Sequence, residues 1–248
     1  MPKLNCPEHL LISLCFIVLF NSSGFSQAPA KDGSDGGDAI KQSVLLYDRF
    51  TGAQASIYNG GDYQPFIFEK DGIPFFESDT LAGGWVGYEG RMYEPMHIQY
   101  DLVRDQVLIL NYDRKAKIVL HNELVDSFQF LNHKFLKLNE NSLQNLRTTG
   151  FYDLLYNGNT IKTFANRKKS IKEVISDNTL IRVFSKWDRF YIFKHDKYYL
   201  VTNKKDVFRL LNDRKSEIKA GMRRQRIKFR RTNFEEALLA ASKIYDQR

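Results

Sequence analysis

Short runs of aromatic and β-branched residues, separated by turn-forming dipeptides, limit most strongly how this chain of 248 residues can fold. Such runs are typical of β-strands. They occur at 55–58, 85–88, 97–100, 107–112, 117–120, 127–131, 135–138, 151–156, 181–184, 190–193 and 198–201. Connectors such as Glu89-Gly90 and Asn157-Gly158 lie between them, and Asn-Gly favours the positive φ angles of a two-residue hairpin turn. The sequence predicts a mainly β, antiparallel, hairpin-rich fold, which could be a curved sheet, a sandwich or a barrel.

The alternation of apolar and polar residues within these runs indicates how the sheet is covered. Residues 128–130 and 135–138 alternate, as in a strand with one buried and one solvated face, whereas residues 107–110 are apolar throughout. A strand without alternation is covered on both faces. We therefore expect one β-rich domain over residues 43–202, with the strand at 107–110 as its central and most buried strand.

The last part of the chain, residues 203–248, has the pattern of helices. Apolar residues recur at helical intervals between 207 and 222, and Gly221 is expected to end that helix. Residues 232–235 fit a capping box at the start of a further helix. The apolar stripe of that helix comprises Phe234, Ala237, Leu238, Ala241, Ile244 and Tyr245. We expect two or three C-terminal helices that pack on the sheet through such stripes.

The N-terminal residues predict export. Residues 10–20 are apolar at every position except Ser13, a length that suits the core of a signal peptide and is too short to span a bilayer. Gly24 and Ser26 are small residues at the spacing that a signal peptidase requires. We place the signal peptide at 1–26, followed by a flexible polar leader at 27–42.

This signal also restricts the rest of the chain. Both cysteines, Cys6 and Cys15, fall inside it, so disulfides are not expected to stabilise the mature protein. No later segment has the length of apolar run that a transmembrane helix needs. The expected destination is the periplasm, the outer membrane or the extracellular medium.

The net charge of +8 belongs to the C-terminal segment alone. Residues 203–248 contain 14 Lys and Arg against 6 Asp and Glu, whereas residues 27–202 contain 22 of each. The densest part is formed by Arg223, Arg224, Arg226, Lys228, Arg230 and Arg231. Either these side chains form a solvated or ion-paired face, or they contact an anion. An exported chain would meet an anionic lipid, an acidic glycan or an acidic envelope protein, and we expect no nucleic acid partner.

No residue pattern in the chain predicts catalysis or a cofactor. The histidines beyond the predicted signal are His97, His121, His133 and His195. None of them has the i, i+2 or i, i+4 spacing that brings two imidazoles together on a metal. The chain has neither a nucleophile elbow nor a phosphate loop. Gly84, Gly87 and Gly90 lie among strand residues, where they predict close packing or a bulge. We therefore name no catalytic, cofactor or metal residue.

Aromatic residues crowd the segment 58–93, and two interpretations are open. Trp85, Tyr88 and Tyr93 could form a surface that binds sugars or peptides, because aromatic faces with polar edges suit such ligands. Alternatively, these residues fill the core of the β domain. Because a β core of this size needs such residues, we favour the second interpretation.

Five segments and the basic C-terminus carry a resemblance to a known group of proteins. They are 58–63 (Tyr-Asn-Gly-Gly-Asp-Tyr), 73–76 (Ile-Pro-Phe-Phe), 88–93 (Tyr-Glu-Gly-Arg-Met-Tyr), 99–102 (Gln-Tyr-Asp-Leu) and 150–158 (Gly-Phe-Tyr-Asp-Leu-Leu-Tyr-Asn-Gly). With them the chain resembles an uncharacterised family of exported β-rich envelope proteins of Gram-negative bacteria. The resemblance implies an envelope location and a β-rich body with terminal helices, and it assigns no residue a role.

Together these patterns lead to one functional hypothesis and one alternative. The hypothesis is a non-catalytic envelope protein that binds an anionic surface or a protein partner through the six basic residues. The alternative is a secreted carbohydrate-binding or carbohydrate-active protein that uses the aromatic segment.

Overall fold

The computed structural model of the chain describes residues 55–68, 70–176 and 179–247, and the single residues 37, 38, 40, 42, 43, 46 and 52. The chain divides into two units, Met1–Leu46 and Tyr47–Arg248. The predicted signal peptide at 1–26 lies outside the described residues. In the segment 27–42, the described positions 37, 38, 40 and 42 have helical backbone conformation and are exposed. All elements below belong to the second unit.

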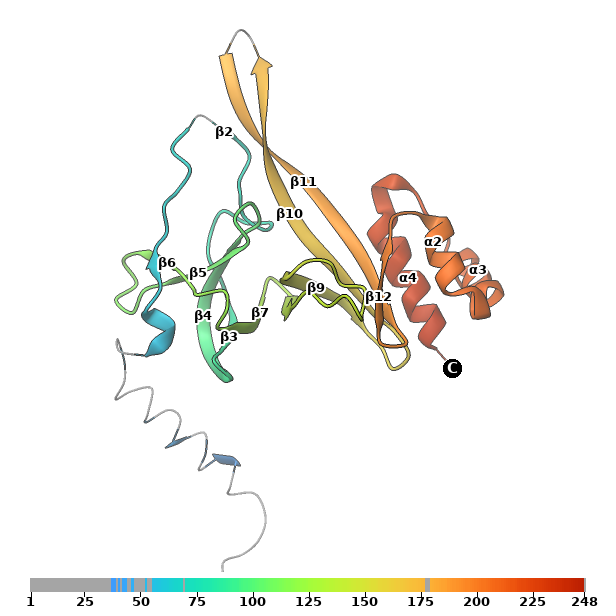
Figure 1. Cartoon of the computed structure of the whole chain (residues 1–248), viewed down its shortest axis with the longest axis horizontal. Coiled ribbons are helices and arrows are strands. Elements are labelled where there is room, and N and C mark those ends of the chain that lie inside the picture. Colours follow the sequence, from blue (N-terminus) through green and yellow to red (C-terminus); the bar gives the residue numbers. More distant parts are fainter. Residues whose placement is uncertain are drawn as a thin grey trace, which may run out of the picture. The chain divides into compact units, whose positions relative to one another are not determined.

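One mainly antiparallel sheet forms the body of the second unit (Figure 1). Its strands are β1 (Gly61–Asp62), β2 (Lys70–Asp71), β3 (Ala82–Tyr88), β4 (Arg91–Asp101), β5 (Gln106–Leu110), β6 (Lys117–Val119), β7 (Val125–Phe130), β8 (His133–Leu138), β9 (Gly150–Asn157), β10 (Lys162–Ser176), β11 (Thr179–Lys194) and β12 (Lys197–Val201). The order is β1-β6-β5-β4-β3-β7-β8-β9-β10-β11-β12, and β2 pairs in parallel with β11. The sheet is open, and the predicted mainly β, antiparallel fold is confirmed.

Tight turns connect neighbouring strands as the sequence predicts. Glu89 and Gly90 join β3 to β4 with φ angles of 52° and 71°, and His195 and Asp196 join β11 to β12 with φ angles of 49° and 57°. Positive φ at both central residues is the geometry of a two-residue turn whose twist matches its strands. Gly84 lies beside a shift of register between β3 and β4, where an added Cβ would meet the Gln129 carbonyl oxygen at 1.9 Å. The predicted role of Gly84 in close packing is therefore confirmed.

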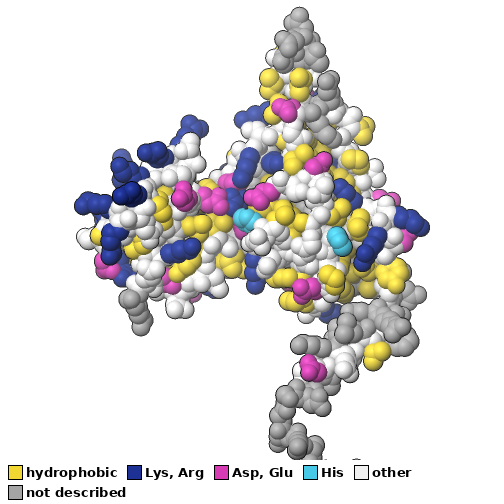
Figure 2. Space-filling model, turned by 180° about the vertical axis from the view of Figure 1, so that it is seen from behind, with side chains coloured by type: hydrophobic (Ala, Val, Ile, Leu, Met, Phe, Trp, Pro, Cys, Tyr) yellow, Lys and Arg dark blue, Asp and Glu magenta, His cyan; other side chains and the backbone are white. Residues whose placement is uncertain are grey.

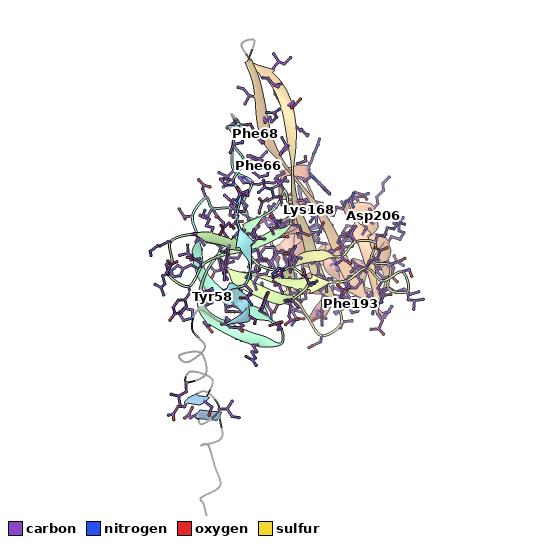
Figure 3. All side chains as sticks on the ribbon, turned by 60° about the vertical axis from the view of Figure 1, so that its left-hand side comes forward. Tyr58, Phe66, Phe68, Lys168, Phe193 and Asp206 are labelled. Atoms are coloured by element: carbon purple, nitrogen blue, oxygen red, sulfur yellow. The ribbon has the colours of Figure 1, made fainter. Side chains whose placement is uncertain are left out.

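The longest hairpin consists of β10 and β11, which pair along their full lengths. β9 pairs only with residues 162–165 of β10, so the outer part of the hairpin extends beyond the neighbouring strands (Figure 1). Figure 3 shows Phe66 and Phe68 beside this hairpin. Their ring centres lie 5.4 Å and 6.3 Å from that of Phe184 on β11. The segment before β2 thus packs on the hairpin through aromatic contacts.

Two predictions of strands differ from the structure. Residues 55–58 were expected to form a strand, but Ser56–Tyr58 is a short 3-10 helix, η2, which inserts Ile57 into the core. Strand β10 was not expected, because residues 167–173 carry five charged side chains. Backbone pairing with β11 and the ion pairs of Arg167 and Lys168 stabilise this strand. Its stability therefore does not depend on apolar burial alone.

The main core lies under β3–β9 and is rich in aromatic rings. Phe128 and Phe135 stack with ring centres 4.8 Å apart, and Tyr100 meets both rings edge-on at 5.2 Å. Edge-to-face and offset contacts are favourable because ring edges are positive and ring faces negative. Val107 and Leu108 on β5 are both fully buried, which confirms burial on both faces, although β5 is third from one end of the sheet and not central.

Three α-helices follow β12 and pack beside the β9–β12 end of the sheet (Figure 1). They are α2 (Lys204–Leu210), α3 (Lys215–Arg224) and α4 (Phe234–Asp246), with short 3-10 helices η3 (Asn212–Arg214) and η4 (Arg231–Asn233) between them. The predicted stripe of α4 faces the core: Ala237, Leu238, Ala241, Ile244 and Tyr245 are buried.

Two details of these helices correct the sequence predictions. Gly221 does not end a helix, because it lies inside α3, where its absent side chain allows Ile244 of α4 to approach. The predicted capping box at 232–235 does not form either. Asn233 instead accepts a hydrogen bond from the Arg230 backbone N–H at 2.9 Å, which fixes the turn before α4.

Candidate functional site

Two neighbouring hollows lie along β12, the last strand of the sheet. Together they form what we call the β12 groove. The first has a volume of about 590 Å³ and the second about 470 Å³. Arg189, Leu200 and Val201 line both hollows, so the two adjoin along the strand. Six basic and two acidic residues line the groove among the described residues: Arg147, Arg189, Lys204, Arg209, Arg230 and Arg231, with Asp188 and Asp206.

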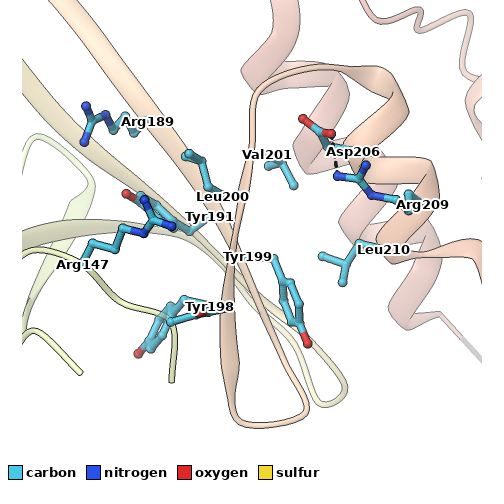
Figure 4. Close-up of a pocket in the computed structure, with 11 residues that line it drawn as sticks. Arg147, Arg189, Tyr191, Tyr198, Tyr199, Leu200, Val201, Asp206, Arg209 and Leu210 are labelled. Carbon is cyan, nitrogen blue, oxygen red and sulfur yellow. Dashed lines mark hydrogen bonds and ion pairs between the residues drawn. The ribbon is translucent and has the colours of Figure 1, made fainter. Parts of the chain in front are cut away.

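The first hollow extends around both faces of β12 (Figure 4). Leu200 of β12 pairs with Tyr191 of β11, and residues two apart in a strand share a face. Arg189, Tyr191 and Leu200 therefore lie on one face of the strands. Asp206 and Arg209 of α2 form the wall on the other side (Figure 4). A ligand in this hollow would contact the edge of the strand as well as both faces.

The charges of the first hollow are incompletely paired. Arg209 forms an ion pair with Asp206 at 2.9 Å. Hydrogen bonds from the backbone N–H and the hydroxyl of Thr202 lower the pKa of the Asp206 carboxyl, which holds it ionised. Arg147 and Arg189 are exposed, and neither has a carboxylate partner among the described residues. The Arg189 guanidinium lies 4.9 Å from the centre of the Trp187 ring, a contact that leaves its charge without a counter-ion. The hollow thus offers two guanidinium groups whose charge no described carboxylate neutralises.

The second hollow has an aromatic wall and a cationic rim. Phe234 lies between Phe190 and Phe229, with ring centres 5.5 Å and 5.7 Å away. Lys204, Arg230 and Arg231 complete the lining. The one carboxylate that lines it, Asp188, is already bound by the Arg167 guanidinium at 2.9 Å. This arrangement suits a ligand that carries both an anionic group and an apolar part.

All six basic residues predicted to contact an anion are exposed, and none forms an ion pair among the described residues. Within the described part of the chain they therefore form a solvated face, which agrees with one form of the alternative given by the sequence, and they do not pair with acidic groups of the body. Arg230 and Arg231 line the second hollow, whereas Arg223, Arg224, Arg226 and Lys228 line neither hollow. Figure 2 shows Lys and Arg side chains gathered over the helical end of this unit.

In the segment between α3 and α4, half-buried apolar side chains alternate with exposed basic ones, and this alternation fixes the conformation of the basic run. Ile227 and Phe229 are half-buried and pack on the core under the helices, whereas Arg226, Lys228 and Arg230 are exposed. The Phe229 ring lies 5.8 Å from that of Phe208 on α2. Alternate apolar anchors of this kind fix an extended segment and direct the intervening side chains outward. The basic run is thus held on the surface with its charges facing solvent.

A buried ion cluster fixes α4 against the sheet beside the groove. Arg167 of β10 is 2% exposed and contacts three carboxylates. It binds Asp153 of β9 at 2.8 Å, Asp188 of β11 at 2.9 Å and Glu235 in the first turn of α4 at 2.6 Å. Burial lowers the pKa of Arg167, but hydrogen bonds with Glu235 and the charge of Asp153 raise it above its ordinary value. The guanidinium therefore stays charged and joins three strands to the helix that carries Phe234.

His133 extends this cluster towards solvent. Its Nδ1 lies 2.8 Å from Asp153 Oδ2, and its Nε2 lies 3.9 Å from Glu77. The hydrogen bond with Asp153 raises the pKa of His133 above its ordinary value, and burial partly opposes the shift. His133 is thus part of a charged network at the start of β8.

The three aromatic residues predicted as a binding surface do not form one exposed surface. Tyr88 is fully buried and belongs to the core, and Tyr93 is half-buried with its ring 6.5 Å from that of Tyr88. Trp85 lines a hollow of about 520 Å³, together with Glu94, Gln129 and Asn132. The Lys134 ammonium lies 5.5 Å from the centre of the Trp85 ring.

Sequence reasoning missed the cations that form the rest of the groove. Arg147 lies between β8 and β9, Arg189 on β11 and Lys204 at the start of α2. Arg147 has no charged neighbour within five residues, Arg189 follows Asp188, and Lys204 lies outside the dense basic run, so the local charge density did not mark them. The available signal was weak: Arg189 lies two residues from both Trp187 and Tyr191, a spacing that places the three on one strand face.

Comparison with known proteins adds no further assignment. No protein-family model, curated protein or solved structure matches this chain. The resemblance to exported envelope proteins accordingly stays a prediction. None of the helices in the described residues combines the length and apolar character needed to cross a membrane. Within the same residues, no three His, Cys, Asp or Glu side chains are grouped as metal ligands.

Proposed function

We propose that this chain is an exported, non-catalytic binding module of the bacterial envelope that holds an acidic partner in the β12 groove. The observation that carries the proposal is the convergence of cations from distant parts of the chain. Arg147, Arg189 and Arg231 come from three separate segments, line adjacent hollows and have no carboxylate partner among the described residues.

The physical argument rests on unpaired charge. Like charges that are close together repel, so a cluster of cations weakens the folded state unless an anion joins it. A guanidinium group binds carboxylate or phosphate with two parallel hydrogen bonds, which are stronger than neutral ones. The wall formed by Phe190, Phe229 and Phe234 would bury apolar parts of the same ligand.

The proposed partner is an acidic envelope protein, with anionic lipid and acidic glycan as the other sources of anionic groups outside the cytoplasm. All three present carboxylate or phosphate groups to the groove. The basic run at 223–231 would add long-range attraction, which speeds encounter and decreases as salt screens it.

The test compares two variants that lose the same charge. In the groove variant, Arg147, Arg189, Arg230 and Arg231 are each replaced by Gln. In the control variant, Arg223, Arg224, Arg226 and Lys228 are each replaced by Gln, and these residues line neither hollow. Binding of fluorescein-labelled hexa-L-glutamate, of anionic vesicles and of hyaluronan oligosaccharides is measured by anisotropy or sedimentation.

We expect the groove variant to bind the preferred probe at least about tenfold more weakly, because a hydrogen bond to a charged group contributes about 1.5–3 kcal/mol. The control variant should lose less, and its loss should shrink as ionic strength rises from about 0.05 M to about 0.5 M. Equal losses in the two variants, or no loss in either, would overturn the proposal. The three probes identify the source of the anionic group.

The hollow beside Trp85 supports a second candidate, a sugar-binding surface. A half-buried indole beside Glu94, Gln129 and Asn132 combines an apolar face with hydrogen-bonding groups, as sugar sites do. Titration with neutral oligosaccharides while tryptophan fluorescence is recorded tests this candidate. Trp85→Ala should abolish the response and Trp187→Ala should retain it. A response that depends on Trp187 alone would exclude the Trp85 hollow.

A further inference from the structure

The edge of β12 that faces away from β11 carries backbone groups that pair with no strand in the described residues. The two-residue turn at His195 and Asp196 makes Lys194 and Lys197 the pair that closes the hairpin with hydrogen bonds. Bonded and non-bonded pairs alternate along an antiparallel ladder. Tyr198 and Leu200 therefore direct their N–H and C=O groups away from β11.

The structure bears out this alternation at Tyr198. Its N–H donates to the Gln144 carbonyl oxygen, outside the sheet, at 2.7 Å. At the other end of the strand, the Thr202 N–H donates to Asp206 Oδ2 at 3.1 Å. Leu200 lies between them and makes no backbone hydrogen bond outside the sheet among the described residues. The open part of the edge is therefore short and centred on Leu200.

Leu200 is also where the β12 groove is most accessible. Its side chain is 48% exposed, and the residue lines both hollows. An open strand edge is a ready template for pairing with another chain. Proteins usually cover such an edge or flank it with charge. Here the flanking charges are Arg147 and Arg189, which line the groove and have no carboxylate partner among the described residues, so an acidic chain would be attracted to the edge.

We propose that the occupant of the groove is an extended acidic peptide segment that adds to β12 as a short strand, and this inference rests on the function proposed above. Its backbone would exchange hydrogen bonds with the N–H and C=O of Leu200. Main-chain bonds then supply affinity and alternate side chains supply specificity. A lipid head group or a glycan could neutralise the arginines, but neither presents an amide and a carbonyl at the spacing of a strand.

The register predicts the sequence pattern of the peptide. The residue opposite Leu200 shares its face of the sheet, which is also the face of Arg189 and Tyr191. This residue should therefore be Glu or Asp. Its two neighbours would point to the other side of β12, where Tyr199 and Leu210 lie (Figure 4). The expected core motif is an acidic residue between two apolar residues.

The experiment uses fluorescein-labelled Gly-Val-Glu-Val-Gly as the probe and the full chain as the receptor. One modified probe carries an N-methyl group on the Glu amide, and another has Gln in place of Glu. The receptor variants are Leu200→Pro, which removes the outward N–H, and Leu200→Ala, which retains it. Proline is tolerated at an edge strand where the N–H faces solvent, so Leu200→Pro should unfold at nearly the same temperature as Leu200→Ala.

We expect N-methylation, the Gln probe and Leu200→Pro each to weaken binding at least about tenfold, whereas Leu200→Ala should stay within about threefold. Equal binding of the plain and N-methylated peptides would overturn the strand-addition proposal, even if Leu200→Pro fails to fold. If hyaluronan or anionic vesicles depend on Arg147 and Arg189 while the peptide does not bind, this inference fails and the proposed function stands. If no anionic probe depends on these arginines, both fail.

Discussion

Arg167 holds Glu235 through two parallel hydrogen bonds, Nη1 to Oε2 at 2.7 Å and Nη2 to Oε1 at 2.6 Å. The two residues are 68 positions apart in the sequence, and they connect β10 to the first turn of α4. Because Phe234 precedes Glu235 and lines the second hollow, this pair also sets the position of the aromatic wall. The geometry of the groove therefore depends on a buried contact outside it.

Replacement of Arg167 by Met should destabilise the protein strongly. It would leave Asp153, which is 1% exposed, as a buried carboxylate without its guanidinium partner. Removal of one partner from a buried ion pair costs about 3–5 kcal/mol. The control is Lys115→Met, because the Lys115–Asp113 pair is exposed and such pairs contribute about 0–1 kcal/mol. Urea unfolding measures both, and a similar cost for the two variants would contradict the buried role of Arg167.

Stability should also depend on the protonation of His133. Its hydrogen bond with Asp153 raises its pKa in the folded state. A raised folded pKa means that the contribution of His133 to stability is complete below the unfolded value of about 6.5 and is lost as pH rises through the folded pKa. His133→Asn keeps a donor near Asp153 but does not titrate.

The free energy of unfolding of both proteins is therefore measured from about pH 5.5 to about pH 8.5, the range in which histidine titrates. The advantage of the wild type over His133→Asn should be largest at the acidic end and should decline towards the alkaline end. A constant difference across the range would show that His133 does not exchange a proton in this window.

Local sequence signals predicted most of the fold, because a hairpin is encoded by short-range features. Turn residues with positive φ and alternating aromatic runs gave the strands from β3 to β9 and β12, and the stripe of α4 gave its buried face. Strand β10 was missed because its stability comes from long-range ion pairs. Arg167 on β10 forms ion pairs with residues on β9, β11 and α4. No local sequence pattern predicts ion pairs between residues so far apart in the chain.

The candidate site could be predicted only in part for a similar reason. Arg230 and Arg231 belong to a dense basic run that local counting finds at once. Arg147 and Arg189 join them only because the sheet order ends at β12, which brings a loop and two strands to one edge. Strand order depends on which hairpins meet in space, and this information is not local.

Gly221→Ala should destabilise the contact between α3 and α4. An added Cβ would lie 2.8 Å from Ile244 Cδ1 and 3.0 Å from its Cγ2. Alanine favours a helix over glycine by about 1 kcal/mol, but overpacking costs about 1–3 kcal/mol. We expect a net loss of about 1 kcal/mol. Ile244→Val removes Cδ1, so the same substitution in that background should cost less, and a double-mutant cycle by urea unfolding measures the coupling.

Phe229→Ala should weaken binding to the groove although it changes no charge. The Phe229 ring is held between Phe208 and Phe234, with ring centres 5.8 Å and 5.7 Å away, and it anchors the segment that carries Arg230. Without this anchor, the ligand must order the segment itself, at about 1–2 kcal/mol for each residue fixed.

Affinity for hexa-L-glutamate should therefore fall about threefold to thirtyfold, as expected for about 0.7–2 kcal/mol. Hydrogen exchange of residues 226–231 should become faster in the same variant. Phe66→Ala is the matched control, because Phe66 also packs in an aromatic cluster but contacts the β10–β11 hairpin and lines neither hollow of the groove. If Phe229→Ala speeds exchange at 226–231 and leaves affinity unchanged, the order of this segment does not contribute to binding.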